Sequence, residues 1–195
     1  MSSIKAILVP GNGGCKPTDN WFPYLKTELE KMGIDAVAPE FPDPQLARAC
    51  YWLPFLENEL KADENTIIIG HSSGAIAAMR YAESHRILGS VLVGTYHTDL
   101  KNDYEKLSGY FNTPWNWEAI KKNQQWVIQF GSSDDPWIPI EEARFVHDKL
   151  STDYYEFVDQ GHFGGDYFKP TFPEALIAIQ SKIALSDRTP KSKNL

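Results

Sequence analysis

Residues 66–82 read TIIIGHSSGAIAAMRYA, and this stretch decides the fold. Residues 66–69 are β-branched throughout and apolar after the threonine, which is typical of a strand buried on both faces of a sheet. Residues 75–82 favour a helix, and a short glycine-containing turn separates the two elements. A strand that leads into a helix in this way is the repeating unit of α/β proteins with a parallel sheet.

The same alternation extends to both sides of this stretch. Short apolar runs predict further strands at residues 6–9, 35–38, 90–93, 126–130 and 154–158. Helices are predicted before Gly33, over residues 45–60 with a kink near Pro54, and over residues 141–150 and 173–185. We therefore expect one α/β domain over residues 1–185, with about six mostly parallel strands and helices on both faces, and a loose basic tail over residues 186–195.

The composition of the 195 residues excludes several classes of protein. With 42% hydrophobic and 23% charged residues, the chain has the balance of a globular domain and not of a disordered one. No apolar run approaches the roughly 20 residues of a membrane span, and the first one is too short for a signal peptide. We expect a cytoplasmic protein, with the nucleus as a second compartment. The net charge of −7 argues against nucleic acid as a partner.

The motif Gly70-His71-Ser72-Ser73-Gly74 carries the strongest chemical signal. It fits Gly-x-Ser-x-Gly, and it lies between a predicted strand and a predicted helix. A tight turn there strains the central serine and lifts its hydroxyl above the sheet, and the helix N-terminus favours developing negative charge. The motif predicts Ser72 as a nucleophile, the alternative being a tight turn that contains an incidental serine.

A serine nucleophile needs a histidine base and a carboxylate that orients the base. Of the five histidines, only His162 lies on a glycine-rich loop after the last predicted strand, where the base is needed. The acid is expected after residues 126–130, where Asp134 and Asp135 are adjacent. Asp135 is favoured because it precedes Pro136 and is biased to an extended backbone. The other aspartate would then stabilise the turn.

Two backbone N–H groups are expected to bind the oxyanion. One belongs to Ser73, which follows the nucleophile, and the other to Asn12 on the loop after the first strand, with Gly13 as the second choice. That loop matches neither glycine-rich phosphate-binding pattern. Cys15 and Cys50 form no Cys-x-x-Cys pair and are read as free thiols, so neither zinc nor another metal is expected.

Residues 98–122 interrupt the alternation with many aromatic side chains. Such an excursion is expected to form a lid or pocket wall, or else to cover the edge of the sheet. Glu40 and Asp43 are candidates to face a substrate amine, although Asp43 also suits a helix cap. An apolar or aromatic substrate group near the serine is expected, with a pocket made by Gly13, Tyr110, Phe111, Trp115, Trp137 and Phe163.

Beyond these motifs, the chain resembles the retinoblastoma-binding protein 9 family of serine hydrolases, in the α/β-hydrolase superfamily. The resemblance covers nearly all residues before about position 185 and rests on residues 9–14, 52–55, 66–81, 108–111, 130–132, 134–136 and 161–163. It implies a trimmed α/β-hydrolase sandwich without a large cap domain, with Ser72, His162 and Asp135 as the catalytic triad. It further implies hydrolysis of small carboxylic esters or amides, including aminoacyl or aromatic compounds and short peptide-like substrates, without a cofactor.

One departure from the family concerns its protein partner, which is bound through a Leu-x-Cys-x-Glu motif. The matching residues here are Leu60-Lys61-Ala62-Asp63-Glu64, with alanine in place of the cysteine. This argues against a retinoblastoma-type partner. The alternative to an enzyme is an interaction or regulatory protein of that type whose hydrolase site is secondary or vestigial.

Overall fold

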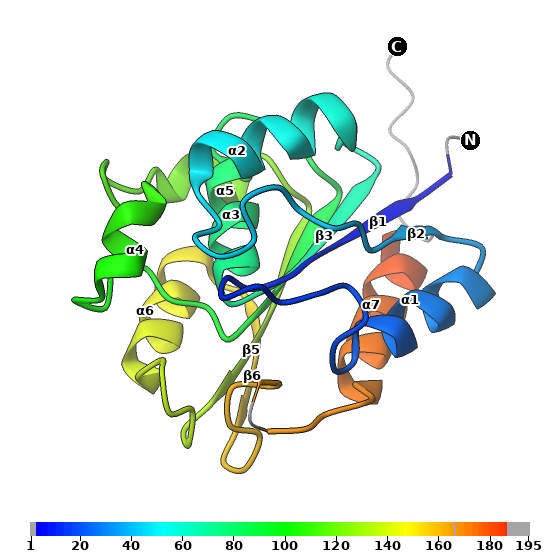
Figure 1. Cartoon of the computed structure of the whole chain (residues 1–195). Helices are drawn as coiled ribbons and strands as arrows, with labels where there is room; N and C mark the ends of the chain where they lie inside the picture. Colours follow the sequence, from blue (N-terminus) through cyan, green and yellow to red (C-terminus); the bar gives the residue numbers. More distant parts are fainter. Residues whose placement is uncertain (1–2, 166, 187–195) are drawn as a thin grey trace.

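A computed structural model describes residues 3–165 and 167–186, and a six-stranded parallel sheet forms its centre (Figure 1). The strand order is β2-β1-β3-β4-β5-β6, and every neighbouring pair is parallel. The strands are β1 (Lys5–Val9), β2 (Asp35–Val37), β3 (Thr66–His71), β4 (Gly89–Val93), β5 (Trp126–Ser132) and β6 (Asp153–Phe157). The predicted number and direction of the strands are confirmed.

Helices cover both faces of the sheet. Figure 1 shows α1 and α7 on one side and α2, α3, α5 and α6 on the other, which confirms the three-layer sandwich. The helical elements are α1 (Phe22–Lys31), α2 (Ala49–Pro54), η1 (Phe55–Glu59), α3 (Ser73–Ala82), α4 (Asp103–Ser108), α5 (Trp117–Lys122), α6 (Ile140–Leu150) and α7 (Pro173–Ser186). Within the described residues, no helix has the length and apolar character that a membrane span requires.

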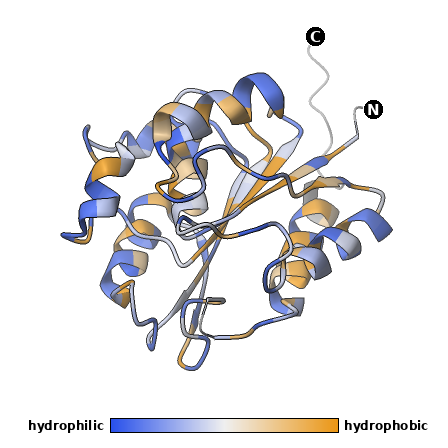
Figure 2. Cartoon of the chain, viewed as in Figure 1, coloured by the Kyte–Doolittle hydropathy of each residue, from blue (hydrophilic) through white to orange (hydrophobic). Residues whose placement is uncertain are grey.

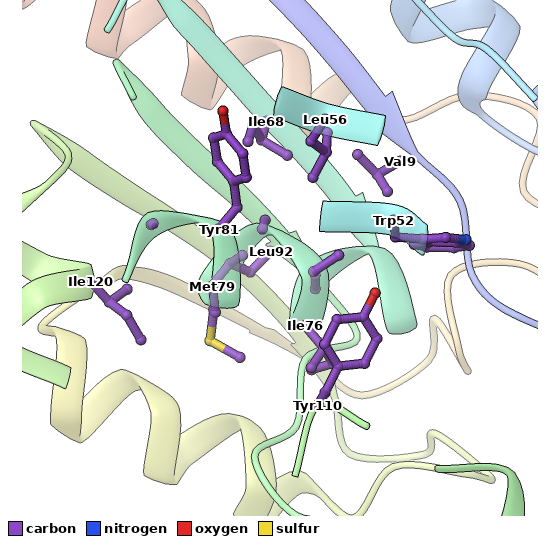
Figure 3. Packing of buried hydrophobic residues seen from close by; sticks show 14 of the residues in the cluster. Val9, Trp52, Leu56, Ile68, Ile76, Met79, Tyr81, Leu92, Tyr110 and Ile120 are labelled. Carbon is purple, nitrogen blue, oxygen red and sulfur yellow. The ribbon is translucent and has the colours of Figure 1, made fainter. Parts of the chain in front are cut away.

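Alternate strand residues feed two separate cores. Ile7 and Ile68 point into the core beneath α2 and α3, which Figure 3 shows, whereas Leu8 and Ile69 point into the core beneath α1 and α7. Strands buried on both faces explain why their sequences are continuous apolar runs. The helices direct apolar faces at the sheet and hydrophilic faces outward (Figure 2).

Two segments differ from their predicted structure. The helix predicted over residues 45–60 begins at Ala49 and changes after Pro54 into a π-helical turn, in which the Leu60 N–H donates to the Phe55 carbonyl at 2.9 Å. The excursion at residues 98–122 contains the short helices α4 and α5, which no predicted element matches. The tail predicted from position 186 lies outside the described residues apart from the last residue of α7.

The strand order determines where a site can form. The connection that leaves β1 runs through α1 on one face of the sheet, and the connection that leaves β3 runs through α3 on the other. These two neighbouring strands therefore form a switch point, and ligands of open α/β sheets bind in the crevice at the carboxyl ends of such strands. The loops that follow β1 and β3 carry Asn12 and Ser72.

Candidate active site

Ser72 forms the turn between β3 and α3 by itself. Strand β3 runs to His71 and α3 begins at Ser73, two residues before the predicted start at Ala75. The backbone of Ser72 has φ 54° and ψ −120°, a conformation that costs a residue with a side chain of order 1–3 kcal/mol. The Ser72 N–H donates to the carbonyl of Val93 at 2.8 Å, which holds the strained residue in place.

Two glycines allow this turn to be so tight. A Cβ atom on Gly70 would lie 2.2 Å from the carbonyl oxygen of Gly74, and one on Gly74 would lie 2.3 Å from the carbonyl oxygen of Val9. Helix α3 therefore approaches the strands more closely than any side chain permits. The two glycines of the Gly-x-Ser-x-Gly motif are therefore required by the close contact between α3 and the strands.

A cavity of about 730 Å³ opens above the turn. Ser72 and His162 border it, as do Asn12 and Gly13 on the loop after β1 and Trp137 on the loop after β5. Its volume lies within the range of small-molecule sites.

Hydrogen bonds hold the imidazole of His162 and the carboxylate of Asp135 in fixed positions. His162 Nδ1 lies 2.6 Å from Asp135 Oδ2, and the two side chains are only 4% and 3% exposed. The other oxygen of Asp135 accepts hydrogen bonds from the N–H groups of Trp137, at 2.9 Å, and Ile138, at 3.0 Å. A carboxylate that accepts from Nδ1–H leaves Nε2 of the imidazole free to take up a proton.

Asp134 binds Ser132 and Gly161 and stabilises the turn. Its Oδ1 accepts from the hydroxyl of Ser132 at 2.5 Å and from the N–H of Gly161 at 3.0 Å. The Ser132 hydrogen bond lowers the pKa of Asp134 below its usual value. The structure therefore brings Asp135, and not Asp134, to the histidine.

The loop that carries His162 is held by two buried ring N–H groups. His71 Nε2 lies 2.7 Å from the carbonyl oxygen of His162, and Trp21 Nε1 donates to the carbonyl of Phe163 at 2.8 Å. Burial lowers the pKa of His71 to about 3, so its ring is neutral and donates from Nε2. Nothing in the sequence links His71 to a carbonyl 91 positions away.

A second residue without a sequence signal is Gly94, directly after β4. A Cβ atom there would lie 3.1 Å from Cε1 of His162, and the backbone has φ +59°. In the described part of the chain no hydrogen bond joins the Ser72 hydroxyl to the imidazole. Catalytic hydrogen bonds of this kind often tighten only when substrate is bound.

Hydrogen bonds in the loop after β1 distinguish between Asn12 and Gly13 as the source of the second oxyanion donor. The Gly13 N–H donates to the carbonyl of Gln45 at 3.1 Å and is therefore already used. The N–H groups of Asn12 and Ser73 have no acceptor among the described residues, and Ser73 is the first residue of α3. These two groups remain available to an anion at the helix N-terminus.

Four of the predicted pocket residues lie elsewhere. Tyr110 is buried in the core beside Ile76 (Figure 3), because its ring fills the space beneath the excursion. Phe111 and Trp115 pack against that core, and Phe163 is buried in the core on the other face of the sheet. Tyr110, Phe111 and Trp115 of the excursion thus pack in or against the core and do not line the cavity. The excursion contributes one aromatic residue, Tyr104, to the cavity wall, together with Leu100, Asn102 and Glu105.

The two acidic candidates for an amine site are also wrong. Asp43 binds the guanidinium of Arg48 through both oxygens, at 2.7 and 3.2 Å, and Glu40 is exposed outside the cavity lining. Across the described ranges, no three His, Cys, Asp or Glu side chains are grouped so that they could hold a metal ion. Cys15 borders the cavity and Cys50 is exposed, and the structure describes both as free thiols.

Residues 60–64 form the turn after η1. The carbonyl of Ala62 accepts from the Tyr81 hydroxyl at 2.8 Å, and its N–H donates to the Leu56 carbonyl at 3.0 Å. The segment is therefore a helix end followed by a polar loop.

Comparison with known proteins places this geometry in a family. Residues 6–180 match the model of the family described as serine hydrolase. Serine hydrolase RBBP9 of Rattus norvegicus is 50% identical over 169 residues, which cover 86% of this chain and 91% of the rat protein. The putative hydrolase YdeN of Bacillus subtilis is 25% identical over 150 residues, 75% of this chain and 79% of its own.

Solved structures agree with the fold. The crystal structure of the ydeN gene product superposes with a TM-score of 0.84 at 23% identity, covering 93% of this chain and all of that one. Sequence and fold together establish that the chain is a hydrolase and belongs to the RBBP9 family of serine hydrolases, in the α/β-hydrolase superfamily.

Proposed function

We propose that this serine hydrolase cleaves small carboxylic ester or amide bonds through an acyl-enzyme on Ser72. The observation that carries the proposal is one cavity bordered by a serine on a strained turn and by a histidine that lies 2.6 Å from a buried aspartate. This is the arrangement that nucleophilic catalysis by a hydroxyl requires.

In the first half of the reaction, Ser72 Oγ attacks the substrate carbonyl carbon while His162 Nε2 takes the hydroxyl proton. Asp135 holds the imidazole in the tautomer that presents Nε2 and stabilises the imidazolium that forms. The proton then passes to the leaving alcohol or amine as its bond to the carbonyl carbon breaks, and the acyl group remains on Ser72.

In the second half, water attacks the acyl carbon and gives a proton to His162, which returns it to Ser72 Oγ as the carboxylic acid leaves. Both tetrahedral intermediates carry a negative oxygen. The N–H groups of Asn12 and Ser73 are suited to bind it, and each such donor is typically worth about 100- to 1,000-fold in rate.

The cavity supports a small-molecule or short peptide-like substrate. Trp137, 52% exposed and in edge contact with the His162 ring, offers an apolar surface next to the reacting centre. Lys16, Asp19 and Asn20 also line the cavity and add polar groups to its wall. We propose an acyl group with an aromatic or apolar part, and aminoacyl compounds are included in this class.

A fluorophosphonate probe tests the proposal directly. The wild-type protein should become labelled and should turn over p-nitrophenyl esters, and Ser72→Ala should lose both activities. Ser84→Ala, which removes an exposed hydroxyl, is the matched control and should behave as wild type. Unchanged turnover in Ser72→Ala would overturn the proposal, and a wild-type protein that is neither labelled nor active would favour the alternative of an interaction protein. A panel of acyl esters and aminoacyl amides then ranks the substrates.

A further inference from the structure

A buried carboxylate that the catalytic triad does not use lies in the wall of the cavity. Glu105 is on α4, and the residue is only 7% exposed. Its Oε1 accepts from the side-chain amide of Asn12 at 2.8 Å, and its Oε2 accepts from the hydroxyl of Tyr96 at 2.7 Å. Burial of a carboxylate costs several kcal/mol unless strong hydrogen bonds offset the cost.

The chain of hydrogen bonds extends beyond Tyr96. The Tyr96 hydroxyl lies 3.3 Å from the hydroxyl of Ser73, and both residues are fully buried. Since Tyr96 gives its proton to Glu105, Ser73 is the donor in this contact. The network thus begins at Asn12, passes through Glu105 and Tyr96, and ends at Ser73.

The two ends of this network are the two residues with unused N–H groups at the site. They come from different parts of the chain: Asn12 from the loop after β1, and Ser73 from the first turn of α3. Oxyanion stabilisation depends on donors held in advance at the correct separation. A rigid link between the two side chains restricts the movement of both donors.

The position of Glu105 within α4 supports a role outside the helix. The pattern Asn102-x-x-Glu105 has the form of a capping box, in which the glutamate bonds back to the N–H of the capping residue. Here that N–H donates to the Asp99 carbonyl at 2.8 Å instead, and the carboxylate faces Asn12 and Tyr96. Its hydrogen bonds therefore serve the site and not the helix end.

We propose that Glu105 is a positioning residue that fixes the oxyanion hole, by binding Asn12 directly and Ser73 through Tyr96. The proposal rests on the proposed function, because it needs Ser72 to generate an oxyanion. It assigns to the excursion between β4 and β5 a part in catalysis without contact between Glu105 and the reacting atoms.

Steady-state kinetics of full-length variants on a p-nitrophenyl ester test this role. Glu105→Ala should lower kcat about 10- to 100-fold and leave KM within about threefold, since the oxyanion exists only along the reaction path. Affinity for a boronic acid that mimics the tetrahedral intermediate should fall with kcat. Glu105→Gln should stay within about threefold of wild type, because its amide can accept from Asn12 and donate to Tyr96.

Non-additivity provides the sharper test. Asn12→Ala keeps the backbone N–H but removes the contact with Glu105. The double variant of Asn12→Ala and Glu105→Ala should lose no more than the worse single variant if both act through one link. Tyr96→Phe should lower kcat in the same way, and it offers a milder change if Glu105→Ala fails to fold.

Glu142→Gln is the matched control. Glu142 also holds the start of the excursion, through the N–H of His97 at 2.8 Å and the hydroxyl of Thr98, but it makes no hydrogen bond to Asn12 or Tyr96. It should lower stability without lowering kcat. Wild-type kcat in folded Glu105→Ala and Tyr96→Phe, or fully additive losses with Asn12→Ala, would overturn the proposal while the role of Ser72 stands. Turnover retained in Ser72→Ala would overturn both.

Discussion

Individual residues at this site are restricted by their neighbours more than by their own chemistry. Ser72 keeps a positive φ because a hydrogen bond to Val93 and the close approach of α3 hold it there. His162 is held from several sides, by Asp135 at its ring and by His71 at its carbonyl. Gly94 has no side chain, so the imidazole of His162 can lie directly against its backbone.

Gly94→Ala should therefore lower kcat by at least about tenfold, because the new methyl group would lie 3.1 Å from the imidazole and displace it. It should also cost about 1 kcal/mol of stability, since alanine is strained at φ +59°. Gly33→Ala is the control: it has φ +79° but no atom within 4 Å of the new Cβ. That variant should lose stability and keep its kcat. Equal kcat in both variants would contradict the steric argument.

The sequence predicted the site at residue scale where chemistry and position coincide. Glycines at fixed spacing mark the turn at Ser72, and His162 follows the last strand, so the sequence predicts the position of both residues, which the structure places at one cavity. The proline after Asp135 favoured it over Asp134, and the structure adds the physical reason, since hydrogen bonds from Gly161 to Asp134 and from Trp137 to Asp135 hold the two carboxylates in different places. The roles of His71 and Glu105 were not predicted, because His71 binds the carbonyl of His162 and Glu105 binds Asn12, which lie 91 and 93 positions away in the chain.

Elements with many local signals were predicted well, and elements that depend on tertiary contacts were not. The four central strands β1, β3, β4 and β5 consist mainly of buried apolar residues, so the sequence alone locates them. Helices α4 and α5 have six residues each, too few for a helical period to show. Their neighbouring aromatic residues look like a pocket lining in sequence, yet the position of a buried cation decides where they pack.

That cation is Arg80 of α3. Its guanidinium donates to the carbonyls of Tyr110 at 2.8 Å and Thr113 at 2.7 Å, binds Glu83, and lies 3.6 Å above the ring of Trp115. The planar guanidinium of Arg80 thus holds the segment between α4 and α5 against the core.

Arg80→Lys should cost about 2–3 kcal/mol of unfolding free energy, because lysine cannot reproduce the planar set of donors and leaves buried carbonyls unpaired. Chemical denaturation measures this loss. Lys106→Arg, at an exposed position on α4 with a single ion pair, is the control and should change stability by less than about 0.5 kcal/mol. A loss in Arg80→Lys no larger than in the control would mean that the segment is held by its apolar contacts alone.

At the scale of the whole molecule, acid should weaken the fold through groups that the two layers bury. His71 has a pKa of about 3 in the folded protein and an ordinary value near 6.5 when unfolded. Between these values the unfolded chain binds more protons, so stability falls as the pH decreases. Glu142 acts in the same direction at lower pH. Although burial opposes it, hydrogen bonds from His97 and Thr98 hold its pKa at about 2, and the stabilisation is lost from about pH 4.5 downward.

We expect the free energy of unfolding of the wild type to fall by up to about 2 kcal/mol between pH 6.5 and 5 on account of His71 alone, at about 1.4 kcal/mol per pH unit for one proton. Urea denaturation at the two pH values measures the difference. His71→Gln keeps an amide donor for the His162 carbonyl but cannot titrate, so its stability should change less over this interval. His71 ends β3, a strand whose residues enter both cores, so we expect its protonation to destabilise the whole fold. The loss should therefore appear in global unfolding, and parallel pH profiles of the two proteins would contradict a buried neutral histidine.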